Sequence, residues 1–207
     1  MSYAFTLAGI AAANMLACLS PGPAFLLISR AAAGRSRTIG LATGLGIALA
    51  ATLWAAAASF GVAAIMTRLA TLYGLIQLAG AVYLIWLGLA AWLHPDSGEA
   101  SLPARGLESR SRAFLVGLSL GLTNPKIVIF FSSIFVALIP AHAPLSLRLA
   151  ALAVVAADEV VYAGLVACLF STPRVRALYQ RLRHGLERVA GALFIAIGAR
   201  IAALARL

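Results

Sequence analysis

Long apolar runs alternate with short polar, arginine-rich segments along this chain. A helix that crosses a lipid bilayer needs about 20 predominantly apolar residues, and six runs approach or exceed that length. The runs cover residues 5–28, 39–66, 69–93, 113–139, 147–170 and 186–204. Arg200 falls inside the last run, close enough to its end for the guanidinium to reach the interface. The pattern predicts an all-α integral membrane protein with six transmembrane helices.

The first run is expected to remain in the mature protein as a transmembrane helix. A secretory signal peptide begins with a basic segment and has a short apolar centre. Residues 1–28 contain no charged residue, and their apolar stretch is longer than a signal peptide requires. Both features favour a retained helix over a cleaved leader.

The arginines between the runs predict the orientation in the membrane. The first, third and fifth connections contain Arg30, Arg35, Arg37, Arg105, Arg110, Arg112, Arg174, Arg176, Arg181, Arg183 and Arg188. The second contains only Arg68, and the fourth only Arg148. Because cytoplasmic loops carry the excess of basic residues, the odd-numbered connections are predicted to face the cytoplasm. Both termini of this multi-pass protein are then predicted to lie outside.

The composition agrees with a membrane protein and argues against a soluble or nucleic-acid-binding domain. Of the 207 residues, 63% are hydrophobic and 11% charged, and the mean hydropathy is +1.00, whereas a soluble domain is roughly half apolar and a quarter charged. The net charge of +10 is not gathered on an aromatic-interleaved surface, so no nucleic-acid partner is expected. Cys18 and Cys168 lie in apolar runs without a CxxC pair, and are interpreted as buried hydrophobic residues.

A polar segment at residues 94–112 divides the chain into two halves of three runs each. Its prolines, glycine and acids are typical of a flexible linker, which the arginine pattern places in the cytoplasm. We expect a single transmembrane domain, 1–207, with one half at 1–93 and the other at 113–207.

Matching strings indicate that the two halves are related. AGAVYLIWLG in the third run is matched by AGALFIAIG in the sixth, and the first and fourth runs each carry a proline near the centre. Chance similarity between alanine-rich strings is the alternative. The matches occur in the same order in both halves, and an odd number of spans requires the second copy to be upside down. The sequence therefore predicts two inverted three-helix repeats, an arrangement found in secondary transporters.

The prolines inside two of these runs free backbone groups in the middle of the membrane. Pro21, Gly22 and Pro23 interrupt the first run, and Asn124 and Pro125 interrupt the fourth. Freed amides and carbonyls cannot face lipid, so they must face protein or a wet cavity. A substrate with a carboxylate and an ammonium group could bind them. A purely structural kink is the alternative.

Three ionisable residues, Lys126, Asp158 and Glu159, lie far from either end of their runs. Each costs roughly 2.5–3.5 kcal/mol at the centre of a membrane, so they are expected to face the interior of the bundle. One interpretation is an ion pair between Lys126 and either acid. The other is that Lys126 binds a substrate carboxylate while an acid binds an ammonium group or carries a coupling proton. Both can hold at different steps of one cycle.

Further polar and small residues accompany these charges. Tyr162 lies one helical turn after Asp158 and could hydrogen-bond to it. Asp158 and Glu159 point about 100° apart around the helix, so we expect them to have different roles. Asn14 is a candidate lining residue, with a helix–helix hydrogen bond as its alternative. The glycines of the second and fourth runs are interpreted as close-packing positions: Gly40, Gly44, Gly46, Gly117 and Gly121.

Three stretches resemble the LysE family of amino-acid exporters, especially its homoserine/threonine-efflux branch. They are LSPGPAFLLISRAAAGRSRTIGLATGLGIA from Leu19, with a PGP motif, IQLAGAVYLIWLGLAAW from Ile76, and AFLVGLSLGLTNPKIVIFF from Ala113, with an NPK motif. Their order and spacing carry the resemblance over most of the chain. The last two helices are recognisable mainly by position.

The resemblance implies a bacterial inner-membrane protein that exports small amino acids or close analogues and is not an enzyme. It implies that export is driven by the proton gradient and that the protein uses no cofactor. It also allows the protein to form a homodimer in the lipid bilayer. Family motifs map substrate binding onto Pro21, Gly22, Pro23, Asn124, Pro125 and Lys126. Some members carry an acid in the second helix, whereas residues 39–66 contain none, so Asp158 and Glu159 would carry the coupling alone.

Other membrane functions compete with secondary export by alternating access. A redox protein of the same superfamily would use paired cysteines, and a metal-cation exporter would need several carboxylate, histidine or cysteine ligands at mid-membrane, where this chain has two acids. An assembly protein would not need charge there. The chain lacks a GxxxxGK[ST] loop, so energy must come from a gradient or a partner. No metal site is expected.

Overall fold

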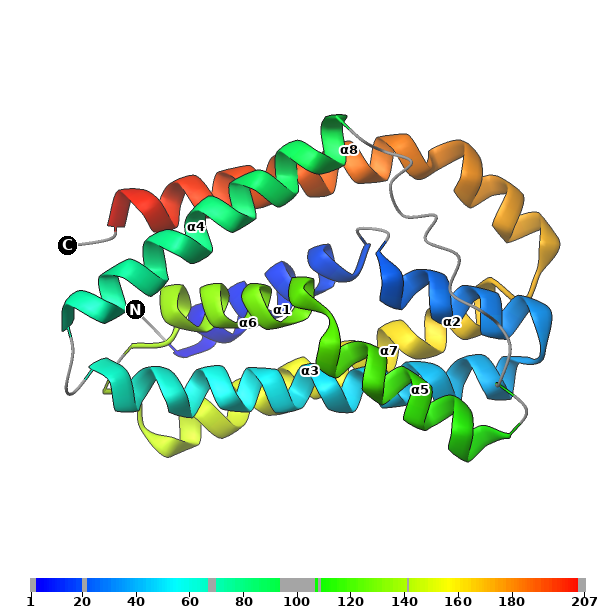
Figure 1. The fold of residues 1–207 in the computed structure, drawn as a ribbon, viewed down its shortest axis with the longest axis horizontal. Coiled ribbons are helices and arrows are strands. Elements are labelled where there is room, and N and C mark those ends of the chain that lie inside the picture. Colours follow the sequence, from blue (N-terminus) through cyan, green and yellow to red (C-terminus); the bar gives the residue numbers. More distant parts are fainter. Residues whose placement is uncertain are drawn as a thin grey trace.

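The computed structural model describes residues 3–19, 22–66, 70–93, 107, 109–140 and 142–204. Within these ranges the regular elements are helices (Figure 1). They are α1 (Tyr3–Leu19), α2 (Pro23–Gly34), α3 (Arg37–Met66), α4 (Ala70–Leu93), α5 (Arg110–Thr123), α6 (Pro125–Leu138), α7 (Leu145–Leu169) and α8 (Pro173–Leu204). The prediction of an all-α protein agrees with this architecture.

Two of the predicted runs are each built from a pair of helices that meet at a proline. Pro23 is the first residue of α2, and Pro125 is the first residue of α6. Proline fits the first turn of a helix but disfavours helical geometry in the residue before it. Gly22 and Asn124 accordingly adopt extended backbone. The chain bends by 62° between α1 and α2 and by 59° between α5 and α6.

By length and composition, two single helices of the described residues could cross a membrane: most of α3 (Arg37–Gly61) and all of α7 (Leu145–Leu169). The α1–α2 and α5–α6 pairs raise the number to four if each pair counts as one span. These findings fit a membrane protein. The larger number of six spans, with α4 and α8 as the third and sixth, stays a prediction.

Helix α8 begins earlier than the apolar pattern indicates. We expected the sixth run to start at residue 186, after a basic loop, whereas the helix runs without a break from Pro173. Its first turns place Val175, Leu178 and Leu182 at helical spacing between arginines. A search for continuous apolar runs misses such an amphipathic segment. Of the predicted linker, residues 94–106 and 108 lie outside the described residues, and α5 already begins at Arg110.

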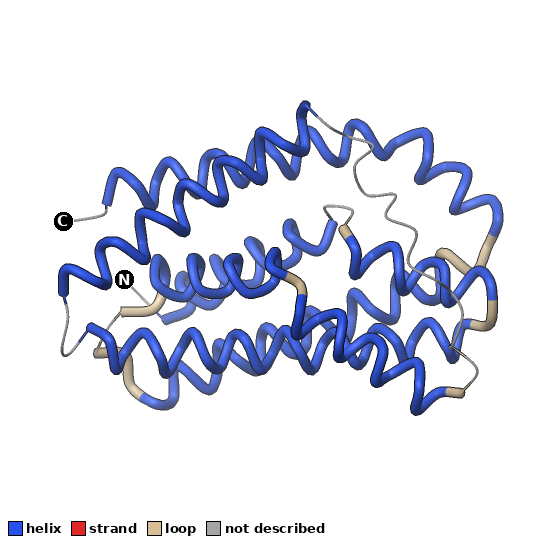
Figure 2. The backbone as a smooth tube through the Cα atoms, viewed as in Figure 1, coloured by secondary structure: helices blue, strands red, loops and turns tan. Residues whose placement is uncertain are grey.

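The helices form an elongated bundle (Figure 2). Figure 1 shows α1 and α2 running away from the end that carries both termini, and α5 and α6 running toward it. Helices α4 and α8 pack side by side along one edge, and α3 packs against α5 and α7 along the other. The main core lies between these layers and includes Phe130, Phe135 and Phe194.

Glycines allow the helix backbones of this bundle to approach closely, as the sequence predicts. A Cβ atom on Gly121 of α5 would lie 2.5 Å from the Cβ of Ala50, and one on Gly46 of α3 would lie 2.7 Å from the backbone nitrogen of Leu118. A Cβ on Gly117 would meet the backbone of Thr43. Close packing at glycine is the common device of membrane helix pairs. The same device joins α3 to α7 through Gly44 and to α2 through Gly40.

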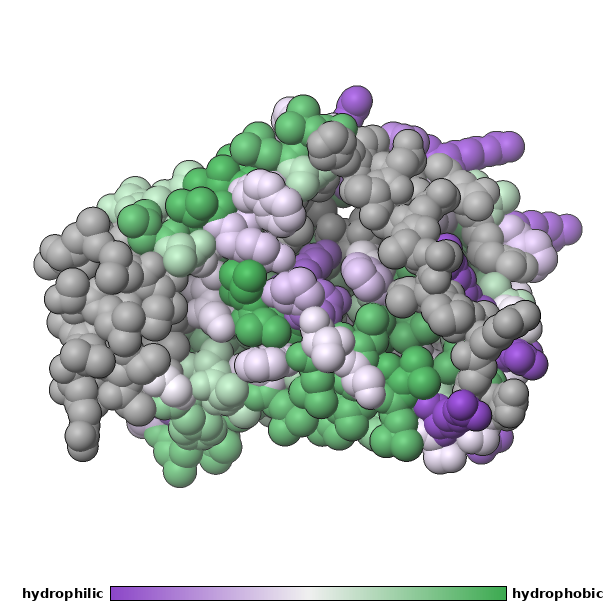
Figure 3. All heavy atoms as spheres, viewed as in Figure 1, coloured by the Kyte–Doolittle hydropathy of each residue, from purple (hydrophilic) through white to green (hydrophobic). Residues whose placement is uncertain are grey.

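The surface divides into an apolar belt along the bundle and a basic end, where Arg35, Arg37, Arg110 and Arg174 are exposed. Large apolar side chains are exposed on α3, α4, α5 and α7, among them Leu53, Trp86, Leu115 and Val161. Figure 3 shows hydrophilic side chains gathered at the end where α2 joins α3 and α7 joins α8, with hydrophobic ones along the length of the bundle. Such an apolar belt suits contact with lipid rather than with water.

Candidate functional site

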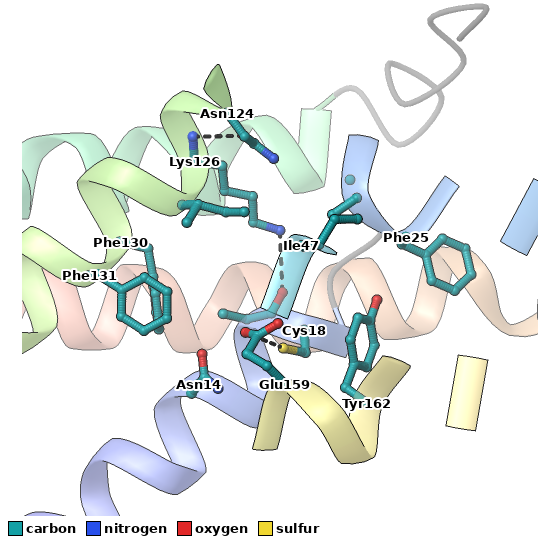
Figure 4. A pocket seen from close by; sticks show the side chains of 14 residues that line it. Asn14, Cys18, Phe25, Ile47, Asn124, Lys126, Phe130, Phe131, Glu159 and Tyr162 are labelled. Carbon is teal, nitrogen blue, oxygen red and sulfur yellow. Dashed lines mark hydrogen bonds between the residues drawn. The ribbon is translucent and has the colours of Figure 1, made fainter. Parts of the chain in front are cut away.

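A cavity lies where the two interrupted helices break. It is partly open and has a volume of about 60 Å³, enough for several water molecules. Its lining comes from α1, α2, α3, α6 and α7 together with the two breaks, as Figure 4 shows. The lining residues are Asn14, Ala17, Cys18, Gly22, Ala24, Phe25, Ile47, Asn124, Lys126, Ile127, Phe130, Phe131, Glu159 and Tyr162.

The two half-helices that start at this cavity are capped differently. Asn124 caps α6 with its own side chain, because its Oδ1 accepts a hydrogen bond of 3.0 Å from the backbone N–H of Lys126. Gly22, at the equivalent position of α2, has no side chain and supplies no such cap. The first amides of a helix lack partners within it and carry partial positive charge. The α2 N-terminus, with Ala24 and Phe25 on the lining, can therefore attract an anion.

Lys126 extends from the first turn of α6 toward the end of α1 (Figure 4). Its Nζ donates a hydrogen bond of 3.3 Å to the carbonyl oxygen of Ala17, in the last turn of α1. The ammonium also lies 5.7 Å from the ring centroid of Phe194. Carbonyls at a helix C-terminus carry partial negative charge, so this end of α1 favours a cation.

The two neighbouring acids of α7 have different surroundings. Glu159 is 7% exposed and lines the cavity, where its Oε1 accepts a hydrogen bond from the Cys18 thiol with a sulfur–oxygen distance of 3.4 Å. Asp158 is more exposed, and its Oδ2 lies 3.5 Å from Nδ2 of Asn14. The predicted turn of about 100° between successive residues explains the difference. The acid that shares the cavity with Lys126 is therefore Glu159.

Tyr162 lies on the cavity wall one turn after Glu159 and is 7% exposed. The sequence suggested a hydrogen bond from Tyr162 to Asp158. In the part of the chain that the structure describes, Asp158 is instead hydrogen-bonded to Asn14. Asn14 thus has both of the roles considered for it, since it lines the cavity and also bonds α1 to α7.

Pro23 and Pro125 set the backbone at the breaks and are not part of the cavity wall. Pro23 and Pro125 are the first residues of α2 and α6, and their side chains are exposed. Pro21 lies outside the described residues. The sequence-predicted residues that the fold brings into one cavity are Asn14, Gly22, Asn124, Lys126, Glu159 and Tyr162.

Sequence reasoning missed Cys18 and the apolar wall of the cavity. Cys18 was interpreted as a buried hydrophobic residue, yet it lines the cavity and contacts Glu159. Its spacing of four residues from Asn14 was the available signal, because such residues share one helix face. Phe130 and Phe131, four residues after Lys126 and Ile127 respectively, carried the same kind of signal. Nothing in the sequence distinguished Ile47, which reaches the cavity from α3.

Known proteins resemble this chain along most of its length. The threonine efflux proteins of Salmonella typhi and of Escherichia coli (strain K12) are each 34% identical to it over 192 residues, which is 91% of this chain and 93% of each relative. The homoserine/homoserine lactone efflux protein of Salmonella typhi is 28% identical over 167 residues, covering 79% of this chain and 76% of that protein. No solved structure matches.

The family of this chain is shown by a match that covers most of its length, beyond any single motif. The family model described as LysE type translocator matches residues 15–204, which include both helix breaks and every residue of the cavity except Asn14. The resemblance that the PGP and NPK motifs indicated is confirmed. This protein belongs to the LysE family of translocators.

Proposed function

We propose that this protein exports small neutral amino acids, with threonine and homoserine as the first candidates. The observation that carries the proposal is one cavity with a cationic side and an anionic side: Lys126 and the uncapped α2 N-terminus on one, Glu159 on the other. A zwitterion presents both matching charges. The relatives named as threonine efflux and homoserine efflux proteins support the same substrate class.

The proposed binding pose follows from these charges. The substrate carboxylate lies between the Lys126 ammonium and the first amides of α2, and the substrate ammonium lies against Glu159. Its side chain then faces the apolar wall at Ile127, Phe130 and Phe131.

We propose alternating access as the transport mechanism, with the two three-helix halves rocking around the cavity. Both halves contain a bent helix pair followed by two further helices, and the bent pairs run in opposite directions. This order supports two inverted repeats and six spans. On the side of the basic end, Phe25 of the cavity wall contacts Phe170 and Tyr179 with ring centroids 4.9 Å and 4.7 Å away. This aromatic cluster is the proposed inner gate.

Glu159 is the proposed site of proton coupling. A single carboxylate buried in the membrane can bind either the substrate ammonium or a proton, so an arriving proton releases the substrate and resets the carrier. Asp158, bonded to Asn14 at the side of the cavity, has a supporting role in this scheme. Coupling then requires one acid from α7 and none from α3.

An efflux assay with two lysine variants tests the proposed function. Bacteria loaded with threonine-containing or homoserine-containing dipeptides would express the intact protein, Lys126→Ala or Lys126→Arg, and extracellular amino acids would be quantified by mass spectrometry. We expect export with the intact protein, background export with Lys126→Ala, and partial export with Lys126→Arg, which keeps the charge. Equal export by Lys126→Ala at equal membrane abundance would contradict the proposal.

A further inference from the structure

The thiol of Cys18 has surroundings that a packing role does not explain. Cys18 lies in the last turn of α1 and lines the cavity, and its Sγ lies 3.4 Å from Oε1 of Glu159. Figure 4 shows the two side chains facing each other beside the cavity, below the Lys126 ammonium. The sulfur therefore contacts the one acid that the proposed function assigns to the substrate ammonium.

We propose that Cys18 is a positioning residue that orients the Glu159 carboxylate toward the substrate, and that its thiol borders the space that the substrate occupies. The proposal rests on the proposed function and extends it to a residue outside the PGP and NPK motifs. It has two separable consequences. Substrate should shield the thiol, and loss of the thiol should weaken substrate binding without slowing the transport step.

A thiol is suited to this task because it is a weak hydrogen-bond donor. It can hold a carboxylate in one rotamer while leaving the other carboxylate oxygen available to an ammonium group. One turn earlier on the same face of α1, Asn14 holds Asp158 in a similar way. The end of α1 thus contacts both acids of α7, and Lys126 bonds to the Ala17 carbonyl in between. A movement of α1 would change all three contacts together.

Thiol labelling tests the location of the sulfur. The chain has two cysteines, so Cys168→Ser leaves Cys18 as the single thiol, and Cys18→Ser leaves the exposed Cys168 as a matched control. Inverted membrane vesicles would be treated with N-ethylmaleimide, with and without saturating L-threonine, and alkylation would be followed by mass spectrometry. We expect threonine to slow alkylation of Cys18 several-fold and to leave alkylation of Cys168 unchanged.

If threonine leaves the Cys18 rate unchanged in vesicles that transport threonine, the thiol does not border the substrate and the proposal is wrong. If the vesicles transport neither threonine nor homoserine, the proposed function fails, and this outcome is measured independently of the labelling. The two failures are therefore distinguishable. The shielding of Cys18 itself is measured in Cys168→Ser, and Cys168 can be followed in the intact protein, so the labelling remains informative if a Cys18 variant does not insert into the membrane.

Transport kinetics test the positioning role. In the same vesicles, Cys18→Ala removes the donor and Cys18→Ser restores it. We expect Cys18→Ala to raise the KM for threonine by about two- to tenfold, as expected for one lost hydrogen bond, with little change in the maximal rate. Cys18→Ser should return the KM most of the way. Unchanged KM in Cys18→Ala, or an equal loss of maximal rate in both variants, would mean that Cys18 only fills space.

Discussion

Asp158 and Glu159 are adjacent in the sequence, yet their side chains lie in different surroundings. Glu159 is buried, lines the cavity and accepts a hydrogen bond from the Cys18 thiol, whereas Asp158 is partly exposed, lies outside the lining and contacts Asn14. A charge on the cavity wall interacts directly with a ligand bound there, and the low dielectric strengthens that interaction. At the scale of single residues, the two acids should therefore differ in function.

Neutral isosteres of the two acids test this difference. We expect Glu159→Gln to reduce threonine export by more than about tenfold, because the substrate ammonium loses a buried charged partner worth roughly 2 kcal/mol or more. Asp158→Asn should retain export within about threefold, since its long contact with Asn14 contributes little. Efflux rates normalised to membrane abundance provide the measurement. An equal loss in both variants would show that the acids act as a pair.

At the scale of helices, the bundle depends on a few glycines that bring backbones together. Helix α5 crosses α3 with Gly117 against the Thr43 backbone, and Gly121 against Ala50. Neither contact leaves space for a larger side chain without separating the helices. Because α3 also contributes Ile47 to the cavity wall, this crossing helps to position the site.

A pair of glycine variants tests the crossing. Gly117→Val should destabilise the protein by about 1–3 kcal/mol, because the new side chain meets helix backbone rather than a flexible side-chain end. Gly164→Val on α7 is the matched control, since a Cβ there would meet no atom within 4 Å. Thermal unfolding in detergent would measure both. If the two variants melt at the same temperature, the α3–α5 contact is looser than the structure indicates.

At the scale of the whole molecule, both termini lie at one end (Figure 1), and the opposite end carries the exposed Arg35, Arg37, Arg110, Arg112 and Arg174, whereas Arg200 is exposed near the C-terminus. A hydrogen bond of 2.8 Å from Arg37 to the Ser171 hydroxyl joins the α2–α3 and α7–α8 connections at the basic end. Toward the opposite end, Arg148 is buried and donates to the carbonyl oxygens of Ser59 and Ala143. Its charge is therefore withdrawn from the surface, which strengthens the contrast between the two ends.

Reporter fusions test the orientation that this contrast predicts. We expect alkaline phosphatase to be active, and green fluorescent protein to be dark, when fused after the C-terminus, because the basic end should face the cytoplasm. Fusions after Ser36, in the α2–α3 connection, should give the opposite result. A fluorescent C-terminal fusion would reverse the predicted topology, and with it the assignment of the aromatic cluster to the inner side.

Several features of the fold and site could be predicted because their cause is local. Proline at positions 23 and 125 interrupts a helix wherever the helix lies, and Lys126 and Glu159 are too costly to leave in lipid. Glycine spacing indicated close packing before any partner helix was known. The predicted start of the sixth helix at residue 186 was wrong, because the amphipathic turns that follow Pro173 do not form a continuous apolar run.

The sequence by itself determined the membrane class, the two helix breaks, the buried charges and, through its motifs, the LysE family. Only the tertiary structure decided that Glu159 rather than Asp158 borders the cavity, that Cys18 contacts it, and that Ile47 closes the wall. The physical reason is that composition fixes what a helix must bury, whereas its rotation is set by the neighbours against which it packs. A rotation of one residue, about 100°, would exchange the two acids.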